Sequence, residues 1–247
     1  MTCKTVVAKL GGSVITVKDS PETINWDSLD LLLDQISGFT GSGGKMALVL
    51  GGGSFGHYVV SSILSKRGSL SIEDAPSIQL SMMKLGLAFL HRAVEKGIRA
   101  TLHPPHTFCS VGSCSFEPLA RDLEAGLTPV TYGDAVPGTG SVSIVSGDDL
   151  AVEISRRLSA ECLFFVVDTG GVIGADGSVL VELDNVGLVE NRGRRKGWDV
   201  TGGMSRKIKA ALQAPRTTLV RIIGTSDLLS AIRGKPVGTL VKARSEG

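Results

Sequence analysis

The chain has 247 residues, of which 42% are hydrophobic and 4% aromatic, so a large aliphatic core is expected and extensive disorder is excluded. A formal net charge of +2, without a basic run interleaved with aromatic residues, argues against a nucleic-acid-binding protein. The first residues lead into a strand pattern and no apolar segment is long enough to span a bilayer, so we expect a soluble cytoplasmic protein with no membrane partner.

Short apolar strands alternate with amphipathic helices along the chain. Strands are predicted at 5–10, 45–49, 100–103, 127–134, 141–146, 163–167, 217–223 and 238–241, and helices at 26–39, from 58, and at 76–97, 117–124, 148–158 and 205–214. This alternation predicts an α/β protein with a mostly parallel sheet and helices on both faces. The stretch 137–140 marks a seam between an N-terminal half, about 1–137, and a C-terminal half, about 138–247.

The four cysteines form no Cys-x-x-Cys pair, and no His/Cys spacing is typical of a zinc site. We therefore expect reduced thiols and no metal held by the protein itself. His103 and His106 flank two prolines, and without a third ligand nearby they are expected in an ordinary loop. The basic cluster 192–196 is equally compatible with a solvated loop and with a place near nucleotide phosphates.

Two glycine loops each follow an apolar strand. Lys9-Leu10-Gly11-Gly12-Ser13 follows the first strand, and Gly51-Gly52-Gly53-Ser54-Phe55-Gly56-His57 follows the second. Backbone N–H groups in such loops bind anions, and glycine lets a ligand approach the main chain. Either loop alone could be a plain turn, and the second also has the spacing of a dinucleotide-binding loop. Together they favour phosphate binding, although no Walker A sequence is present.

Three further glycine-containing segments also have a composition that favours phosphate binding, namely Gly133-Asp134, Ser146-Gly147-Asp148 and Thr201-Gly202-Gly203. Phosphoryl transfer needs two anions held in line and cations that stabilise the moving group. The cations that we assign to this task are Lys9, Lys18 and Lys207, with His57 beside them.

These motifs, in this order, resemble the amino acid kinase superfamily over nearly the whole chain. Within it, the run 11–16 with Lys18 and the loop ending at His57 look like isopentenyl phosphate kinases, and fosfomycin kinases carry a similar glycine-histidine loop. The resemblance implies a three-layer αβα sandwich, a homodimer, and transfer of phosphate from ATP with Mg²⁺. The acceptor that it implies is isopentenyl phosphate, bound by the N-terminal half, with the nucleotide in the C-terminal half.

The resemblance also implies residue roles. Lys9, Lys18, His57 and Lys207 are the implied catalytic group. The acceptor side is Gly52, His57, Gly147 and Asp148, and the ATP side is Lys9, Gly11, Gly12, Ser13, Gly53, Asp168, Thr169, Gly202 and Lys207. We predict that His57 is a hydrogen-bond donor and partial cation rather than a base, because a phosphate acceptor is already anionic at neutral pH.

Two positions depart from the family pattern: Leu50 stands where histidine is common, and Gly170 where a second aspartate is often found. Two alternatives are a kinase of fosfomycin-type phosphonates and a non-catalytic small-molecule sensor of the same fold. The helix 76–97 is expected to line the pocket for the acceptor's apolar part, through Met82, Met83 and Leu87.

Overall fold

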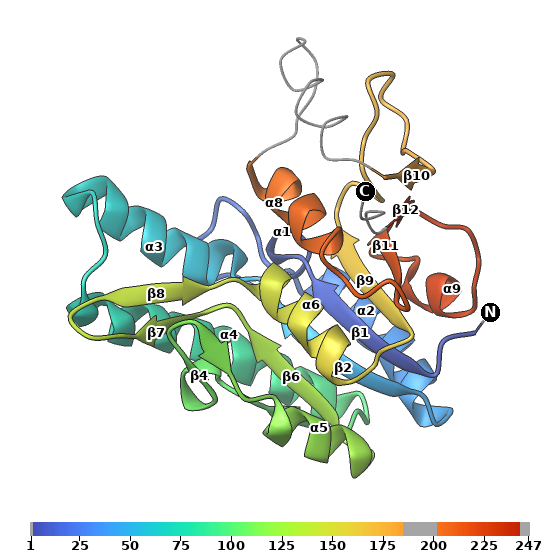
Figure 1. The fold of residues 1–247 in the computed structure, drawn as a ribbon, viewed down its shortest axis with the longest axis horizontal. Helices are drawn as coiled ribbons and strands as arrows, with labels where there is room; N and C mark the ends of the chain where they lie inside the picture. The colour runs from blue at the N-terminus through green and yellow to red at the C-terminus, as the bar shows by residue number, and fades with distance from the viewer. Residues whose placement is uncertain (1, 185–201, 243–247) are drawn as a thin grey trace.

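The computed structural model describes residues 2–184 and 202–242 (Figure 1). Its centre is an eight-stranded sheet in the order β10-β12-β11-β9-β1-β2-β6-β3. Neighbouring strands are parallel except β11 and β12, so the predicted mostly parallel sheet is confirmed. The strands are β1 (Thr5–Leu10), β2 (Lys45–Leu50), β3 (Ala100–Leu102), β6 (Thr128–Tyr132), β9 (Cys162–Val167), β10 (Glu182–Leu183), β11 (Leu219–Gly224) and β12 (Thr239–Val241).

Helices cover both faces of the sheet. In β1, Val6, Ala8 and Leu10 belong to one buried cluster and Val7 to another, as the period of two in a strand requires. Helices α2 (Trp26–Gly41), α4 (Ala75–Glu95) and α9 (Leu228–Ile232) pack into the first cluster. Helices α5 (Glu117–Glu124), α6 (Gly147–Arg157) and α8 (Gly202–Ala211) pack into the second, which confirms the three-layer αβα sandwich.

The glycine-rich helix starts lie earlier than predicted. Helix α3 (Gly53–Arg67) begins at Gly53, so His57 lies on the helix and not in the loop before it. Helix α8 likewise begins at Gly202, and Gly12–Ile15 forms a short helix, α1. Glycine has a low helix propensity, so the sequence predicted turns there. At α1 and α3, close packing between the two glycine loops overrides that preference.

A separate hairpin stands beside the main sheet. Strands β7 (Asp134–Pro137) and β8 (Val142–Val145) pair antiparallel, and Figure 1 shows them on the side of the molecule where α3 and α4 lie. The predicted strand 127–134 therefore ends at Tyr132, and 137–140 lies at the hairpin's turn. The division into two functional halves stays a prediction. Short elements complete the described fold: η1 (Ile72–Asp74), η2 (Pro105–Thr107), β4 (Cys109–Ser110) and β5 (Ser113–Cys114).

All four cysteines are paired, so the expectation of reduced thiols is wrong for this structure. Cys3 bonds to Cys162 because β1 and β9 are neighbours, with Val6 in register with Cys162. Cys109 and Cys114 close the small β4–β5 hairpin. Neither pair has a spacing that marks it in the sequence. Among the described helices, none is long and apolar enough to cross a membrane.

Candidate active site

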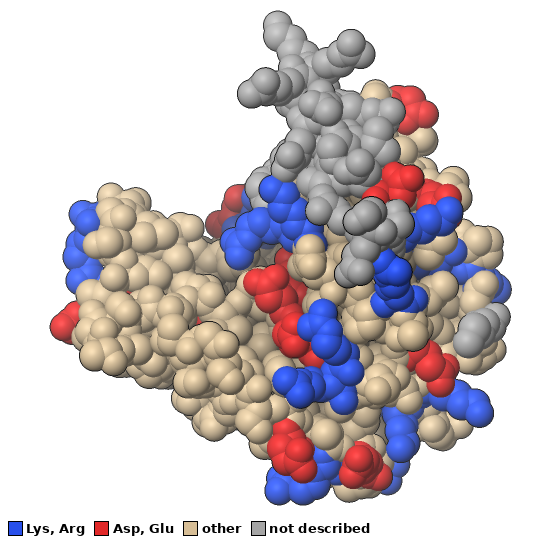
Figure 2. Space-filling view, viewed as in Figure 1, with Lys and Arg blue, Asp and Glu red and all other residues tan. Residues whose placement is uncertain are grey.

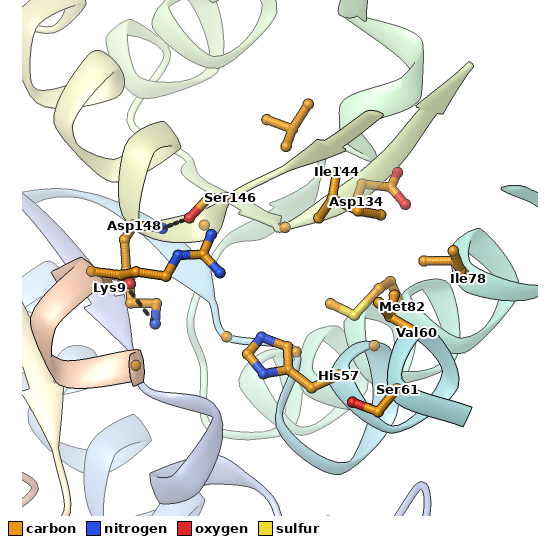
Figure 3. Close-up of a pocket in the computed structure, with 18 residues that line it drawn as sticks. Lys9, His57, Val60, Ser61, Ile78, Met82, Asp134, Ile144, Ser146 and Asp148 are labelled. Carbon is orange, nitrogen blue, oxygen red and sulfur yellow. Dashed lines mark hydrogen bonds and ion pairs between the residues drawn. The ribbon is translucent and has the colours of Figure 1, made fainter. Parts of the chain in front are cut away.

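A cavity of about 370 Å³ opens where α3, α4, the β7–β8 hairpin and the first turns of α6 and α8 meet (Figure 3). Its lining residues are Lys9, Gly51, Gly52, Gly56, His57, Val60, Ser61, Ile78, Met82, Gly133, Asp134, Ile144, Val145, Ser146, Gly147, Asp148, Gly203 and Arg206. Lys9 lies near the carboxyl end of β1, and Gly51 and Gly133 directly follow β2 and β6, which is where ligands bind in open α/β sheets. One end of the cavity is cationic and the other is apolar, with His57 between them (Figure 3).

The cationic end is organised by one carboxylate. Asp148, in the first turn of α6, accepts the ammonium groups of Lys9 from β1 and Lys207 from α8 at the same oxygen, Oδ1, at 2.9 and 3.0 Å. All three side chains are largely buried, and the Lys207 ammonium also lies 5.5 Å from the centre of the Phe165 ring. Two positive charges share one negative charge, so the group retains an excess positive charge that a phosphate can neutralise.

The pKa values of this group follow from its burial and its charges. Burial acts to raise the pKa of Asp148, but Lys9 and Lys207 overcome that effect and lower it to about 2. Burial, followed by repulsion from Lys9, lowers the pKa of Lys207 to about 7 although Asp148 acts against it. A bound phosphate would favour the charged lysine again. Without a bound anion, the positive charge of the cationic end is therefore not fully neutralised.

The two glycine loops are in backbone contact. A Cβ on Gly12 would lie 2.3 Å from the amide nitrogen of Gly53, and one on Gly51 would lie 2.4 Å from the amide nitrogen of Gly12. Gly53 also has a φ of +45°, which residues with a Cβ adopt rarely. Only glycine lets the loop after β1 and the loop after β2 approach this closely.

Helix N-termini add to the anion-binding character of the site. The first turns of α3, α6 and α8 contribute Gly56, Gly147 and Gly203 to the cavity walls. Ser146 caps α6 by accepting the amide N–H of Asp148 at 3.2 Å. Free N–H groups and the positive end of the helix dipole favour phosphate at such positions.

His57 stands between the two ends of the cavity, with its side chain open to it. Desolvation by the surrounding protein lowers its pKa, and Lys9 and Arg206 lower it further, while Asp148 acts in the opposite direction. The lowered pKa favours the neutral imidazole in the free protein, whereas bound phosphates would favour the charged form, so the predicted partial positive charge stays a prediction. A neutral ring still has one N–H to donate, so the predicted donor role stays a prediction.

The apolar end is lined by side chains from three elements: Val60 on α3, Ile78 and Met82 on α4, and Ile144 and Val145 on β8 (Figure 3). Of the three α4 residues expected to line the pocket for the acceptor's apolar part, only Met82 does so. Met83 is not among the lining residues and Leu87 is 55% exposed, so the prediction is wrong for these two. The face of α4 that lines the cavity is therefore not the face that is exposed to solvent.

The two loop histidines each pair with a carboxylate. His106 Nδ1 lies 2.7 Å from Asp134 Oδ2, and His103 Nε2 lies 2.9 Å from Asp122 Oδ2. Asp134 lines the cavity beside Ile144 although its side chain is almost fully buried, and burial raises its pKa although its hydrogen bonds with His106 oppose that effect. Within the described ranges, no group of three His, Cys, Asp or Glu side chains could hold a metal ion.

The structure brings together many of the residues that the sequence singled out. Lys9, Gly52, His57, Gly147 and Asp148 line the cavity, and Lys207 joins it through Asp148. The loop residues Gly11, Gly12 and Gly53 lie next to it, in the chain segments that follow β1 and β2.

Other predicted residues lie outside the cavity. Lys18 and Ser13 are exposed and do not line it. Asp168 and Thr169 follow β9, outside the lining set, and Gly202 opens α8. The basic cluster 192–196 lies outside the described residues.

Some lining residues were not predicted. Arg206 faces the cavity one residue before Lys207, and the motif that contains both could have pointed to it. Ile144 and Val145 come from a hairpin that the sequence analysis did not recognise. The role of Asp148 as the shared partner of two lysines also had no signal in the local sequence.

Comparison with known proteins agrees with this geometry. The model of the amino acid kinase family matches residues 4–224. The chain belongs to the amino acid kinase family. It is 34% identical to the isopentenyl phosphate kinase of Haloferax volcanii, over 96% of this chain and 98% of that one. It is 27% identical to the isopentenyl phosphate kinase of Thermoplasma acidophilum, over 84% and 86%. The fold matches a crystal structure of the Thermoplasma enzyme in a product complex with a TM-score of 0.79 at 23% identity, covering 96% of this chain and all of that one.

Proposed function

We propose that the protein is an ATP-dependent kinase that phosphorylates isopentenyl phosphate to isopentenyl diphosphate. The observation that carries this proposal is the polarity of the cavity, which runs from the Lys9–Asp148–Lys207 group past His57 to an apolar end. An acceptor with a phosphate at one end and a short hydrocarbon at the other fits that order. The similar proteins from Haloferax and Thermoplasma are isopentenyl phosphate kinases, which supports isopentenyl phosphate as the acceptor.

The two phosphates would meet at the glycine loops. Lys9 and Lys207 would bind phosphate oxygens of ATP and of the transferred group, and Asp148 would hold both ammonium groups in place. His57 would donate its ring N–H to the acceptor phosphate, beside Gly52. No base is required, since the attacking phosphate oxygen is already anionic. Positioning and charge stabilisation are the main contributions that a protein makes to phosphoryl transfer.

The nucleotide would lie on the C-terminal half, about 138–247, and the acceptor on the N-terminal half, about 1–137. Gly11, Gly12 and Ser13 would contact the ATP phosphates, together with Gly53, and Asp168, Thr169 and Gly202 would border the nucleotide. The positive charge of the Lys9–Asp148–Lys207 group and the helix N-termini favour the binding of a triphosphate. Mg²⁺ held by ATP phosphates would neutralise charge during transfer, as in other kinases.

The test is a turnover assay with purified protein, ATP, Mg²⁺ and isopentenyl phosphate. ADP release and isopentenyl diphosphate, identified by mass spectrometry, are the expected result. Fosfomycin serves as the competing acceptor. Turnover of fosfomycin without turnover of isopentenyl phosphate would reject the proposed acceptor, and ATP binding without transfer to either would reject the kinase activity.

We also propose a homodimer formed through α4. Leu80, Met83, Leu87, Leu90 and Val94 recur at alternating intervals of three and four residues along its outer face, a spacing typical of helix–helix seams. Leu80, Leu87 and Val94 are 57%, 55% and 57% exposed. A second copy of α4 would bury this stripe by symmetry.

Light scattering of wild type and Leu87→Lys tests the dimer. The wild type should have twice the mass of the chain, and Leu87→Lys should shift toward the monomer. Val111→Lys, at an equally exposed valine on the β4–β5 hairpin, is the control and should leave the mass unchanged. A monomeric wild type would reject the proposal.

A cytoplasmic location stays a prediction, and the proposed need for ATP is consistent with it. Disulfides are more typical of oxidising compartments. Mass spectrometry of the protein after alkylation of the freshly lysed cells, which adds one alkyl group to each free thiol, would measure whether the two pairs are oxidised in the cell.

A further inference from the structure

A buried hydroxyl lies at the junction of the two glycine loops. Thr16, 2% exposed, donates from Oγ1 to the carbonyl oxygen of Gly12 at 2.7 Å. Thr16 Oγ1 also accepts the amide N–H of Ser54, at 2.9 Å. One side chain therefore connects the loop after β1 to the first turn of α3, across a junction where only backbone atoms otherwise meet.

The bond from Ser54 explains how α3 is capped. The first N–H groups of a helix have no partner within the helix and are usually bound by an N-cap side chain. The N-cap of α3 is Gly52, which has no side chain to offer. Thr16 replaces it from a distant part of the sequence, so Gly52 remains free of a side chain at the cavity wall.

Ser54 extends the connection to the segment 17–23. Its hydroxyl, in a side chain that is also buried, accepts the amide N–H of Thr23 at 3.3 Å and lies 3.2 Å from the Thr23 carbonyl oxygen. Its own carbonyl accepts the amide N–H of Glu22 at 3.0 Å. The segment is a small hairpin, closed by the antiparallel bridge between Thr16 and Ile24, and it carries Lys18.

Contacts on the Glu22 side of this hairpin also fix its position. Glu22 has a φ of +47°, an uncommon conformation for a residue with a Cβ, which persists only where surrounding contacts fix it. Its carboxylate pairs with Lys84 of α4 at 2.6 Å. The hairpin is therefore attached to α3 through Ser54 and to α4 through Lys84.

We propose that Thr16 and Ser54 are positioning residues, whose hydroxyls fix the donor-phosphate loop, the acceptor loop and the Lys18 hairpin relative to one another. This inference rests on the proposed kinase function. Neither residue lines the cavity, so neither touches the reacting atoms. Their effect is geometric: they set the distance between the two loops that would hold the two phosphates in line. A displacement of about 1 Å in such a site can cost on the order of 100-fold in rate.

The test compares Thr16→Val with Thr16→Ser and with a matched control. Valine keeps the shape of threonine but leaves the Ser54 amide unpaired and removes one of the two hydrogen bonds to the Gly12 carbonyl, which still accepts the backbone N–H of residue 16, so kcat should fall by roughly 10- to 100-fold. KM for ATP and for isopentenyl phosphate should change by less than about 3-fold, because each loop keeps its own phosphate contacts. Thr16→Ser restores the hydroxyl and should recover most of kcat.

Thr218→Val is the control. Thr218 is also buried and also donates to a backbone carbonyl, that of Ala160 at 2.9 Å, but it precedes β11 at the opposite end of the sheet. Both valine variants should lower Tm, and only Thr16→Val should lower kcat strongly. Equal losses of kcat in the two variants, or a Thr16→Ser variant as impaired as Thr16→Val, would overturn the proposal.

Hydrogen exchange separates this inference from the proposed acceptor. The amides of Glu22, Thr23 and Ser54 should exchange faster in Thr16→Val than in wild type, whichever acceptor is correct. Unchanged exchange would show that the hydrogen bonds of Thr16 do not hold these segments together, and it would overturn the inference even in an active kinase. If wild type uses another phosphorylated acceptor, the proposed acceptor is rejected and the kcat ratio is measured with that one.

Discussion

The two ends of the cavity are built in different ways. The cationic end joins residues that are distant in sequence, Lys9, Asp148 and Lys207, through two ion pairs at a single oxygen atom. The apolar end takes its side chains from α3, α4 and β8, and no ion pair links them. Figure 2 shows a related contrast on the visible surface, where charged side chains gather over α6 and α8 while the lobe formed by α3 and the β7–β8 hairpin is mostly uncharged away from its tip.

This difference indicates a division of tasks. Ion pairs in a buried site have a strict geometry, and loss of one partner leaves an uncompensated charge. Apolar contacts are non-directional and tolerate changes of shape at modest cost. We therefore expect the cationic end to determine whether transfer occurs and the apolar end to determine which acceptor is used.

Asp148→Asn should have the largest effect. An amide cannot balance two ammonium groups, so Lys9 and Lys207 would repel each other and leave their positions. We expect kcat to fall by about 1000-fold, a loss similar to that of a key electrostatic contact in other enzymes, and stability to fall by about 3–5 kcal/mol. Steady-state kinetics and urea unfolding measure the two effects.

Asp149→Asn is the matched control, since it makes the same chemical change one residue further along α6. In the described part of the chain Asp149 forms no ion pair with Lys9 or Lys207, and its variant should keep kcat within about 3-fold. Similar losses in both variants would mean that the charge of this helix end, and not the shared carboxylate, is what matters.

His57 lies at the boundary between the two ends, and its variants test to which end it belongs. His57→Ala should lose about 2–4 kcal/mol of transition-state stabilisation, by analogy with a lost oxyanion donor. His57→Gln should keep part of the activity, because an amide still donates a hydrogen bond. ATP affinity, measured by calorimetry, should hardly change in either. If the glutamine variant bound acceptor normally and were as inactive as the alanine variant, a donor role would be excluded.

Acid unfolding tests the ion pairs of the cationic end separately from the apolar end. The folded-state pKa of Asp148 is about 2, below its ordinary value of 3.8, so its ion pairs stabilise the fold fully above pH 4 and less as the pH falls toward 2. The stabilisation lost over this range is about 2 kcal/mol. The difference in unfolding free energy between wild type and Asp148→Asn should shrink by that amount between pH 5 and pH 2. A difference independent of pH would exclude an ionised Asp148 as its cause.

The sequence predicted the parts of the site that depend on local patterns. Strand periodicity and glycine loops placed Lys9 and His57 near the cavity, and the glycine motif before Lys207 pointed to that lysine. The shared carboxylate of Asp148 and the Thr16–Ser54 link were not predicted, since each depends on contacts between segments distant in sequence. The Cys3–Cys162 bond was missed for the same reason, since it follows from the pairing of β1 with β9.

The smallest effect is expected at the apolar end. Ile144 is 44% exposed on β8 and contributes its side chain to the cavity wall, so Ile144→Ala removes acceptor contacts with little loss of stability. The loss of a few methylene contacts in a hydrophobic pocket costs about 1–3 kcal/mol, which predicts a KM for isopentenyl phosphate raised by roughly 5- to 100-fold. Since kcat depends on the cationic end, it should stay within about 2-fold. Acceptors with bulkier hydrocarbon groups should lose less than isopentenyl phosphate, because they can fill the new space. Val111→Ala, which shortens an exposed valine away from the cavity, should change neither constant. A fall in kcat with unchanged KM in Ile144→Ala would show that the two ends are coupled and that acceptor choice and chemistry are not divided between them.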